Sequence, residues 1–173
     1  MAARFGGAVA GGRRRHVDVV RLDGAITAVN RLALAVASVF LVLIFVVAAL
    51  GVVFRYVIQH SLPWSDETAA YLFIWLVFLG AASEIRNNGH PAVHFVVDRL
   101  PPGARRFAGA VANLAIAIWG GVLLVYGIKA VILEAPESWS SVPAISLQIP
   151  YAAIPLGGAL IIVFALGKAV TRR

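Results

Sequence analysis

The stretch SLPWSDETAAYLFIWLVFLGAA, residues 61–82, places two carboxylates directly before a long run without charge. We predict that this run is a helix with Ser65 as its N-cap and Asp66 and Glu67 in its first turn. A helix N-terminus favours side-chain oxygens and negative charge, which explains both acids at this place. Such a helix has about 19 residues, close to the length that crosses a bilayer. Trp64 suits the start of a span, since indole rings favour the membrane interface.

Three further blocks are free of Asp, Glu, Lys and Arg over the roughly 20 residues that a membrane helix needs. The predicted spans are about 32–54, 65–83, 107–128 and 149–167. A hydrophobic content of 61% and a mean hydropathy of +0.88 exceed what the surface of a soluble protein tolerates. We therefore predict an all-α integral membrane four-helix bundle.

The basic residues predict the orientation of this bundle, because Lys and Arg stay on the cytoplasmic side. Most of them lie before the first predicted span, between the second and third spans, or after the fourth. These are Arg4, Arg13, Arg14, Arg15, Arg21, Arg31, Arg86, Arg99, Arg105, Arg106, Lys168, Arg172 and Arg173. Both termini are therefore predicted to be cytoplasmic, with Asp66 and Glu67 facing outward. This bias accounts for the net charge of +7, so no nucleic-acid partner is predicted.

The segments outside the spans complete the predicted domain organisation. Residues 1–31 form a cytoplasmic segment, 32–167 the membrane domain and 168–173 a basic tail. Residues 1–15 are rich in Gly, Ala and Arg and are predicted to be disordered. The part up to residue 31 has apolar residues at helical spacing, which fits a short helix lying on membrane lipid or a helical extension of the first span. The first span lacks a small-residue cleavage site and is predicted to stay as an anchor.

Several kinds of chemistry are excluded or disfavoured. The chain has no cysteine, which excludes disulfides and iron–sulfur ligation. The histidines lie outside the predicted spans, so a haem held between helices lacks its usual ligands; they are His16, His60, His90 and His94. The last two have metal-ligand spacing but no nearby third ligand. We predict no catalytic residue, no metal and no cofactor, and a protein that is not an enzyme but assists a transport-competent partner.

The stretch SLPWSDETAAYLFIWLVFLGAASEIRNNGHPAVHFVVDRLP, with the later IPYAAIPLGGAL, resembles the small membrane subunit, DctQ type, of tripartite ATP-independent periplasmic (TRAP) transporters. The matching residues are Trp64, Ser65, Glu67, Leu79, Gly80, Ala81, Ala82, His90, Leu100, Pro101, Ile149, Pro150, Tyr151, Ile154, Pro155, Leu156 and Gly157. The resemblance covers about residues 30–170. Pro91 and His94 depart from the family pattern, which places an Ile and an Asp there.

The resemblance implies a division of labour in a bacterial inner membrane. A large membrane subunit moves the substrate by a sodium-driven elevator motion, a periplasmic binding protein delivers it, and the small subunit braces the fixed part. The implied substrates are small organic acids, and no catalytic residue is carried over. Two rival functions stay open: a self-sufficient four-helix exporter and a non-catalytic anchor subunit of a membrane redox complex.

Charged and aromatic residues at the two ends of the second span are the candidate partner contacts: Trp64, Asp66, Glu67, Glu84, Arg86 and His90. The acids at the outer end have an alternative role that needs no partner, which is to cap and position their own helix. Glu84 and Arg86 leave the helix at membrane depth, where an unpaired charge is costly. We predict that Glu84→Ala or Arg86→Ala weakens co-purification of the large subunit.

Overall fold

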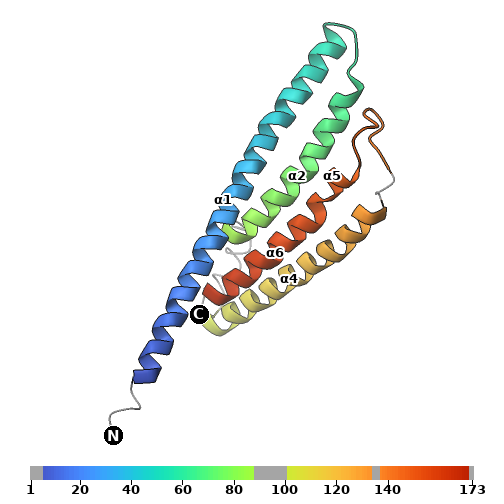
Figure 1. Ribbon diagram of the computed structural model, residues 1–173. Helices are drawn as coiled ribbons and strands as arrows, with labels where there is room; N and C mark the ends of the chain where they lie inside the picture. Colours follow the sequence, from blue (N-terminus) through green and yellow to red (C-terminus); the bar gives the residue numbers. More distant parts are fainter. Residues whose placement is uncertain (1–5, 88–100, 134–136, 172–173) are drawn as a thin grey trace.

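The computed structural model describes residues 6–87, 101–133 and 137–171 (Figure 1). Its helices are α1 (Gly6–Tyr56), α2 (Pro63–Asn87), α4 (Pro102–Leu133), α5 (Gln148–Tyr151) and α6 (Ala153–Thr171). Four segments are long and apolar enough to cross a membrane, namely Asp23–Tyr56, Pro63–Asn87, Gly103–Leu133 and Gln148–Lys168. The described residues contain no strand. The prediction of an all-α protein with four membrane helices is confirmed.

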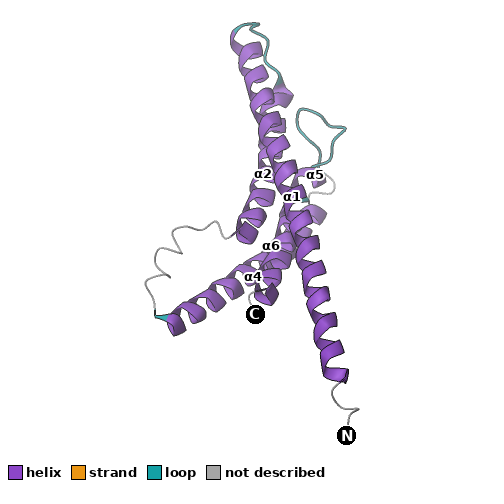
Figure 2. Cartoon of the chain, turned by 90° about the vertical axis from the view of Figure 1, so that its left-hand side faces the viewer, coloured by secondary structure: helices purple, strands orange, loops and turns teal. Residues whose placement is uncertain are grey.

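The long helices lie side by side in the order α1, α2, α6 and α4 (Figure 1). In Figure 2, the upper parts of α1 and α2 overlap, whereas α4 is steeply inclined to both. Since α2 and α6 have a neighbour on each side, they supply most of the buried residues. The helices at the two ends of the row are covered on one side only, and 11% of the most apolar stretch of α1 and of α4 is buried.

The contact between α1 and α2 is built from small residues and one aromatic pair. Ala33 and Ala37 of α1 are buried against Leu79 of α2. One turn further along, the rings of Phe40 and Trp75 meet edge to face with their centroids 6.3 Å apart. Alanines let the two helix backbones approach closely, so that the larger rings fill the space beside them.

Helix α1 is one continuous helix from Gly6, so the separate interfacial helix does not form and the alternative, an extension of the first span, is what the structure has. The helix also includes residues 6–15, where composition predicts disorder. Adding a residue to an existing helix gains one hydrogen bond per residue fixed, which is far easier than starting a new helix. The division of the chain into a cytoplasmic segment (1–31), a membrane domain (32–167) and a basic tail (168–173) stays a prediction.

The start of α2 corrects one sequence prediction. The helix begins at Pro63, and Ser65 lies inside it instead of capping it. The Ser65 hydroxyl donates to the carbonyl of Leu62 at 2.8 Å. Proline is well suited to a first helical position because its φ is already helical and its missing N–H has no partner there. Ser65 is 1% exposed and lies against Gly51, where an added Cβ would come within 2.8 Å of its hydroxyl oxygen.

Glycines let α4 and α6 pack closely. A Cβ added at Gly158 would lie 2.7 Å from the amide nitrogen of Leu124 and 2.8 Å from the carbonyl oxygen of Gly120, so the two backbones touch. Toward the start of α6, Gly127 faces Pro155 in the same way. The proline follows a break at Ala152, which separates the short α5 from α6. Because Pro155 stands in the first turn of α6, its missing N–H leaves no gap in the hydrogen-bond ladder.

Candidate functional site: the two ends of helix α2

Asp66 and Arg55 form an ion pair at the end of the hairpin between α1 and α2. The guanidinium Nη2 of Arg55 donates to Asp66 at 2.6 Å, and both side chains are exposed, at 49% and 72%. An exposed pair of this kind contributes little to stability because water screens both charges. Asp66 lies in the first turn of α2, where its charge also complements the positive end of the helix dipole.

Glu67 holds the loop between α4 and α5 against α2. Its carboxylate accepts hydrogen bonds from the backbone amides of Ser140 and Ser141, at 3.0 and 2.9 Å. The Ser141 hydroxyl donates to the same carboxylate, and the Tyr71 hydroxyl donates to it at 2.9 Å. Bonds to an ionised acceptor are stronger than those between neutral groups, so one side chain fixes the middle of this loop. Residues 137–147 are called the outer loop below.

An aromatic contact adds to this arrangement. The rings of Tyr71 and Trp139 lie 4.6 Å apart between centroids, with their planes tilted by 54°, so the outer loop contacts α2 through aromatic packing as well as through hydrogen bonds. Backbone pairing between Ser138 and Ser146 closes the loop on itself. The result is a compact loop attached to the start of α2 through Glu67 and Tyr71.

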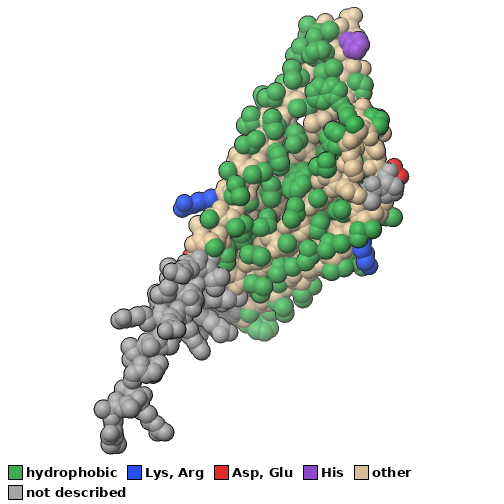
Figure 3. Space-filling model, in the orientation of Figure 1, with side chains coloured by type: hydrophobic (Ala, Val, Ile, Leu, Met, Phe, Trp, Pro, Cys, Tyr) green, Lys and Arg blue, Asp and Glu red, His purple; other side chains and the backbone are tan. Residues whose placement is uncertain are grey.

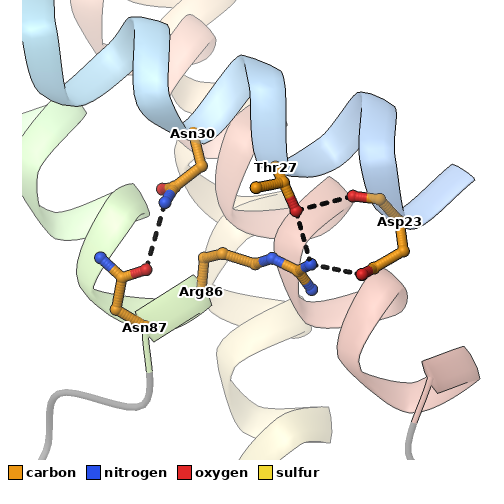
Figure 4. A network of polar contacts seen from close by, with 5 residues as sticks. All are labelled: Asp23, Thr27, Asn30, Arg86 and Asn87. Atoms are coloured by element: carbon orange, nitrogen blue, oxygen red, sulfur yellow. Dashed lines mark hydrogen bonds and ion pairs between the residues drawn. The ribbon is translucent and has the colours of Figure 1, made fainter.

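The opposite end of α2 carries a second polar network (Figure 4). Arg86 forms an ion pair with Asp23 of α1 and donates to the Thr27 hydroxyl at 3.2 Å. The Thr27 hydroxyl donates to the backbone carbonyl of Asp23 at 2.7 Å. Beside this group, the Asn30 amide donates to Asn87 at 3.1 Å. The guanidinium side chain is only 14% exposed, so this pair is better shielded from water than the one at the other end.

The structure gives the predicted contact residues different surroundings. Asp66, Glu67 and Arg86 all bind groups of this chain, whereas Glu84 is exposed and Trp64 is 37% exposed. His90 lies outside the described residues. Partner contact by any of these residues stays a prediction, because their intrachain bonds neither require a partner nor exclude one.

Sequence reasoning missed the partners of these charged residues. Asp23 and Thr27 face Arg86, and the outer-loop serines face Glu67, but nothing local in the sequence pairs residues this far apart. The available signal was that Arg86 leaves a helix at membrane depth, where a charge needs a partner. Among the residues that the structure describes, no three His, Cys, Asp or Glu side chains cluster as metal ligands.

Comparison with known proteins decides the family. A family model described as "Tripartite ATP-independent periplasmic transporters, DctQ component" matches residues 44–173. The chain belongs to this DctQ family. The match includes both charged residues of the pair Arg55–Asp66, together with Glu67 and Arg86, so most of the polar contacts of α2 lie within the family region.

Relatives of this DctQ chain include a putative TRAP transporter small permease protein of Haemophilus influenzae, 33% identical over 45% of this chain and 48% of the relative. A C4-dicarboxylate TRAP transporter small permease protein of Rhodobacter capsulatus is 30% identical over 58% of this chain and 44% of the relative. The similarity thus spans about half the length of these relatives. The sialic acid TRAP transporter permease protein SiaT of Haemophilus influenzae is 24% identical over 58% of this chain but only 16% of its own length. A DctQ-like region can therefore be part of a much longer permease chain.

Proposed function

We propose that this DctQ chain is the small structural subunit that braces a large, sodium-coupled elevator subunit during uptake of a small organic acid. In this proposal a periplasmic binding protein delivers the substrate, and the chain described here does not bind it. The chain lies in the bacterial inner membrane. The observation that supports this role best is the distribution of charged side chains along the four membrane helices.

The middle of each membrane helix lacks Asp, Glu, Lys, Arg and His, as in residues 32–54 of α1 and 153–167 of α6. A charge at the centre of a bilayer costs roughly 2.5 to 3.5 kcal/mol, and carriers accept this cost where they bind an ion or a charged solute. Here the charged residues near the helix ends include two ion pairs, Arg55–Asp66 and Arg86–Asp23. This supports an assisting role over a self-sufficient exporter, and family membership gives no support to a redox anchor.

The shape of the protein also supports a bracing role. A single row of helices leaves α1 and α4 with broad apolar surfaces, and Figure 3 shows hydrophobic side chains over most of the face in view. Lipid covers part of such a surface in a membrane. The exposed apolar face of the helix row can also pack against the membrane helices of a second protein.

The same proposal includes the orientation of the chain. Both termini lie toward the same end of the helix row (Figure 1), as an even number of crossings requires. The concentration of Arg and Lys near this end favours the cytoplasmic side. In this arrangement, residues 1–31 and 168–173 are cytoplasmic, and the outer loop faces the periplasm.

The substrate class is proposed from chemistry shared by relatives. The names of two relatives contain C4-dicarboxylate and sialic acid, which are both organic acids. We extend only this shared property to the transporter that contains the present chain. The identity of the acid would depend on the binding protein and the large subunit.

Reconstitution tests the assignment. The chain is placed in liposomes alone, with the large subunit, and with the large subunit and binding protein under a sodium gradient. We expect accumulation of organic acid only in the complete system, and recovery of the large subunit through a tag on this chain. Accumulation driven by this chain alone would support the exporter instead, and failure of the large subunit to co-purify would contradict the bracing role.

A further inference from the structure

Trp119 lies on the exposed side of α4 at the middle of the predicted bilayer. The uncharged run of this helix covers residues 107–128, so its midpoint falls between residues 117 and 118. Trp119 is 61% exposed, although it lies within this uncharged run. A large, exposed side chain with a polar N–H therefore stands where lipid tails would be deepest.

Packing against α6 gives an independent estimate of this depth. Gly120, the next residue, lies against Gly158 of α6, since a Cβ at Gly120 would be 3.1 Å from the Gly158 carbonyl oxygen. Residue 158 is the midpoint of the uncharged run 149–167. The centres of two antiparallel helices thus meet beside Trp119, so its mid-membrane position does not depend on where the ends of α4 are drawn.

This depth is unfavourable for a tryptophan that faces lipid. Indole rings concentrate at the membrane interface, where the N–H can reach water or headgroups, whereas hydrocarbon offers no acceptor. Trp119 makes no hydrogen bond within the described part of the chain. Trp75, near the middle of α2, contrasts with it because its ring is half-buried and packs against Phe40. A protein neighbour would supply both ring contact and an acceptor for Trp119.

Small residues lead up to Trp119 along the same side of α4. Ala108, Ala112 and Ala115 precede it at intervals of four, three and four residues, which places all of them on one helix face. Ala115 is exposed and the other two are half-buried. Small side chains let another membrane helix come close, and a large aromatic residue beside them can fill the remaining space. These four residues are called the Trp119 surface below.

We propose that the Trp119 surface binds a transmembrane helix of the large permease subunit, which presents a carbonyl or hydroxyl acceptor to the indole N–H at mid-membrane depth. This inference rests on the proposed function and adds the place of contact. A protein occupant fits the unpaired donor, which neither lipid tails nor water can satisfy at this depth. The long relative SiaT, of which the matching region covers only 16%, fits a second membrane-embedded part as that occupant.

A crosslinking experiment identifies the occupant. The photoreactive amino acid benzoylphenylalanine replaces Trp119 in tagged chain co-expressed with the large subunit, and irradiated membranes are analysed for adducts. Leu114 serves as the matched control, because it is 62% exposed but lies roughly 140° around the helix. We expect an adduct with the large subunit from position 119 and little from position 114. An adduct with a second copy of this chain, or with lipid alone, would overturn the inference.

Two substitutions at Trp119 distinguish the contribution of the indole N–H to binding from the contribution of the aromatic ring. We expect Trp119→Phe to lower recovery of the large subunit about threefold and Trp119→Ala about tenfold or more, with less than twofold change for Leu114→Ala. Thermal unfolding of the isolated small subunit should be the same for all three variants, because Trp119 is exposed there. Unchanged recovery with Trp119→Ala overturns the inference while leaving the bracing role intact. If the unaltered chain recovers no large subunit, the proposed function itself is wrong, and the inference fails with it.

Discussion

Asp23 of α1 accepts a hydrogen bond from the Arg86 guanidinium of α2, although 63 residues separate them in the sequence (Figure 4). The Arg86 side chain is 14% exposed, while that of Asp23 is 43% exposed. This pair therefore joins the two helices at the level where the apolar part of α1 begins. Its orientation is opposite to that of the pair at the other end, where α1 supplies the base Arg55 and α2 the acid Asp66.

The first prediction concerns this pair. Arg86→Ala should destabilise the α1–α2 hairpin by about 1 kcal/mol, a figure kept low because Asp23 is partly open to solvent. Exchanging the charges, with Asp23→Arg and Arg86→Asp together, should restore part of the loss. Thermal unfolding in detergent measures both effects as a double-mutant cycle. Glu84→Ala is the control, since Glu84 is exposed. If the protein with both charges exchanged is no more stable than the less stable single variant, the result would contradict the pairing.

The second prediction concerns Glu67 and the outer loop. Glu67→Ala removes the acceptor of both serine amides and of two hydroxyls, so the loop should open more often. We expect cleavage of the outer loop by a protease to become roughly tenfold faster while the helices stay resistant. Asp66→Asn is the matched control, because Asp66 binds Arg55 and not the loop. Equal cleavage rates in Glu67→Ala and unaltered protein would show that the loop is held by other contacts.

The third prediction compares two neighbouring glycines of α4. Gly120→Ala should destabilise the protein by about 1 to 3 kcal/mol, because the added Cβ would come within 2.9 Å of Ile161 and Ile162 and force α4 away from α6. Gly121→Ala has open space around its Cβ and should be neutral or stabilise by up to about 1 kcal/mol through helix propensity. Melting temperatures of the two variants check this. A higher melting temperature for Gly120→Ala than for Gly121→Ala would mean that α4 and α6 do not meet at Gly120.

The fourth prediction compares two buried serines of α2. The Ser65 hydroxyl donates to the carbonyl of Leu62, whereas the Ser83 hydroxyl is buried and has no hydrogen-bond partner among the residues that the structure describes. Ser65→Ala should therefore cost about 1 kcal/mol, and Ser83→Ala should be neutral or stabilising, because it removes an unsatisfied polar group. Denaturation curves of both variants are the test. A clear loss from Ser83→Ala would show that this hydroxyl has a partner in the membrane-embedded protein.

Much of the fold could be predicted from the sequence, because a membrane imposes simple rules. Length without charge identifies a span, and the four predicted spans overlap the long helices of the structure. The acids after Trp64 correctly indicate a helix start, but the prediction that Ser65 caps it is wrong. Pro63 begins the helix instead, since its geometry already suits the first position.

The partners of the charged residues could not be predicted. Arg86 and Glu67 were identified as candidate contacts, but their bonds to Asp23 and to the outer loop depend on how distant segments meet. The glycines that meet a neighbouring helix could not be predicted either: Gly120 and Gly158 bring α4 and α6 together, and Gly157 lies against Phe78 of α2. The rotation of a helix about its axis is decided by its neighbours, and an evenly apolar helix gives little local sign of it.

The four apolar helices and the placement of charges near their ends follow from the order of residues along the chain, because hydrocarbon penalises every unpaired charge and every free backbone group. The arrangement of the helices in one row, the bond between Arg86 and Asp23, and the exposure of Trp119 are known from the folded structure alone. Those features depend on which helix faces pack together, and packing selects among rotations that have nearly the same hydrophobicity.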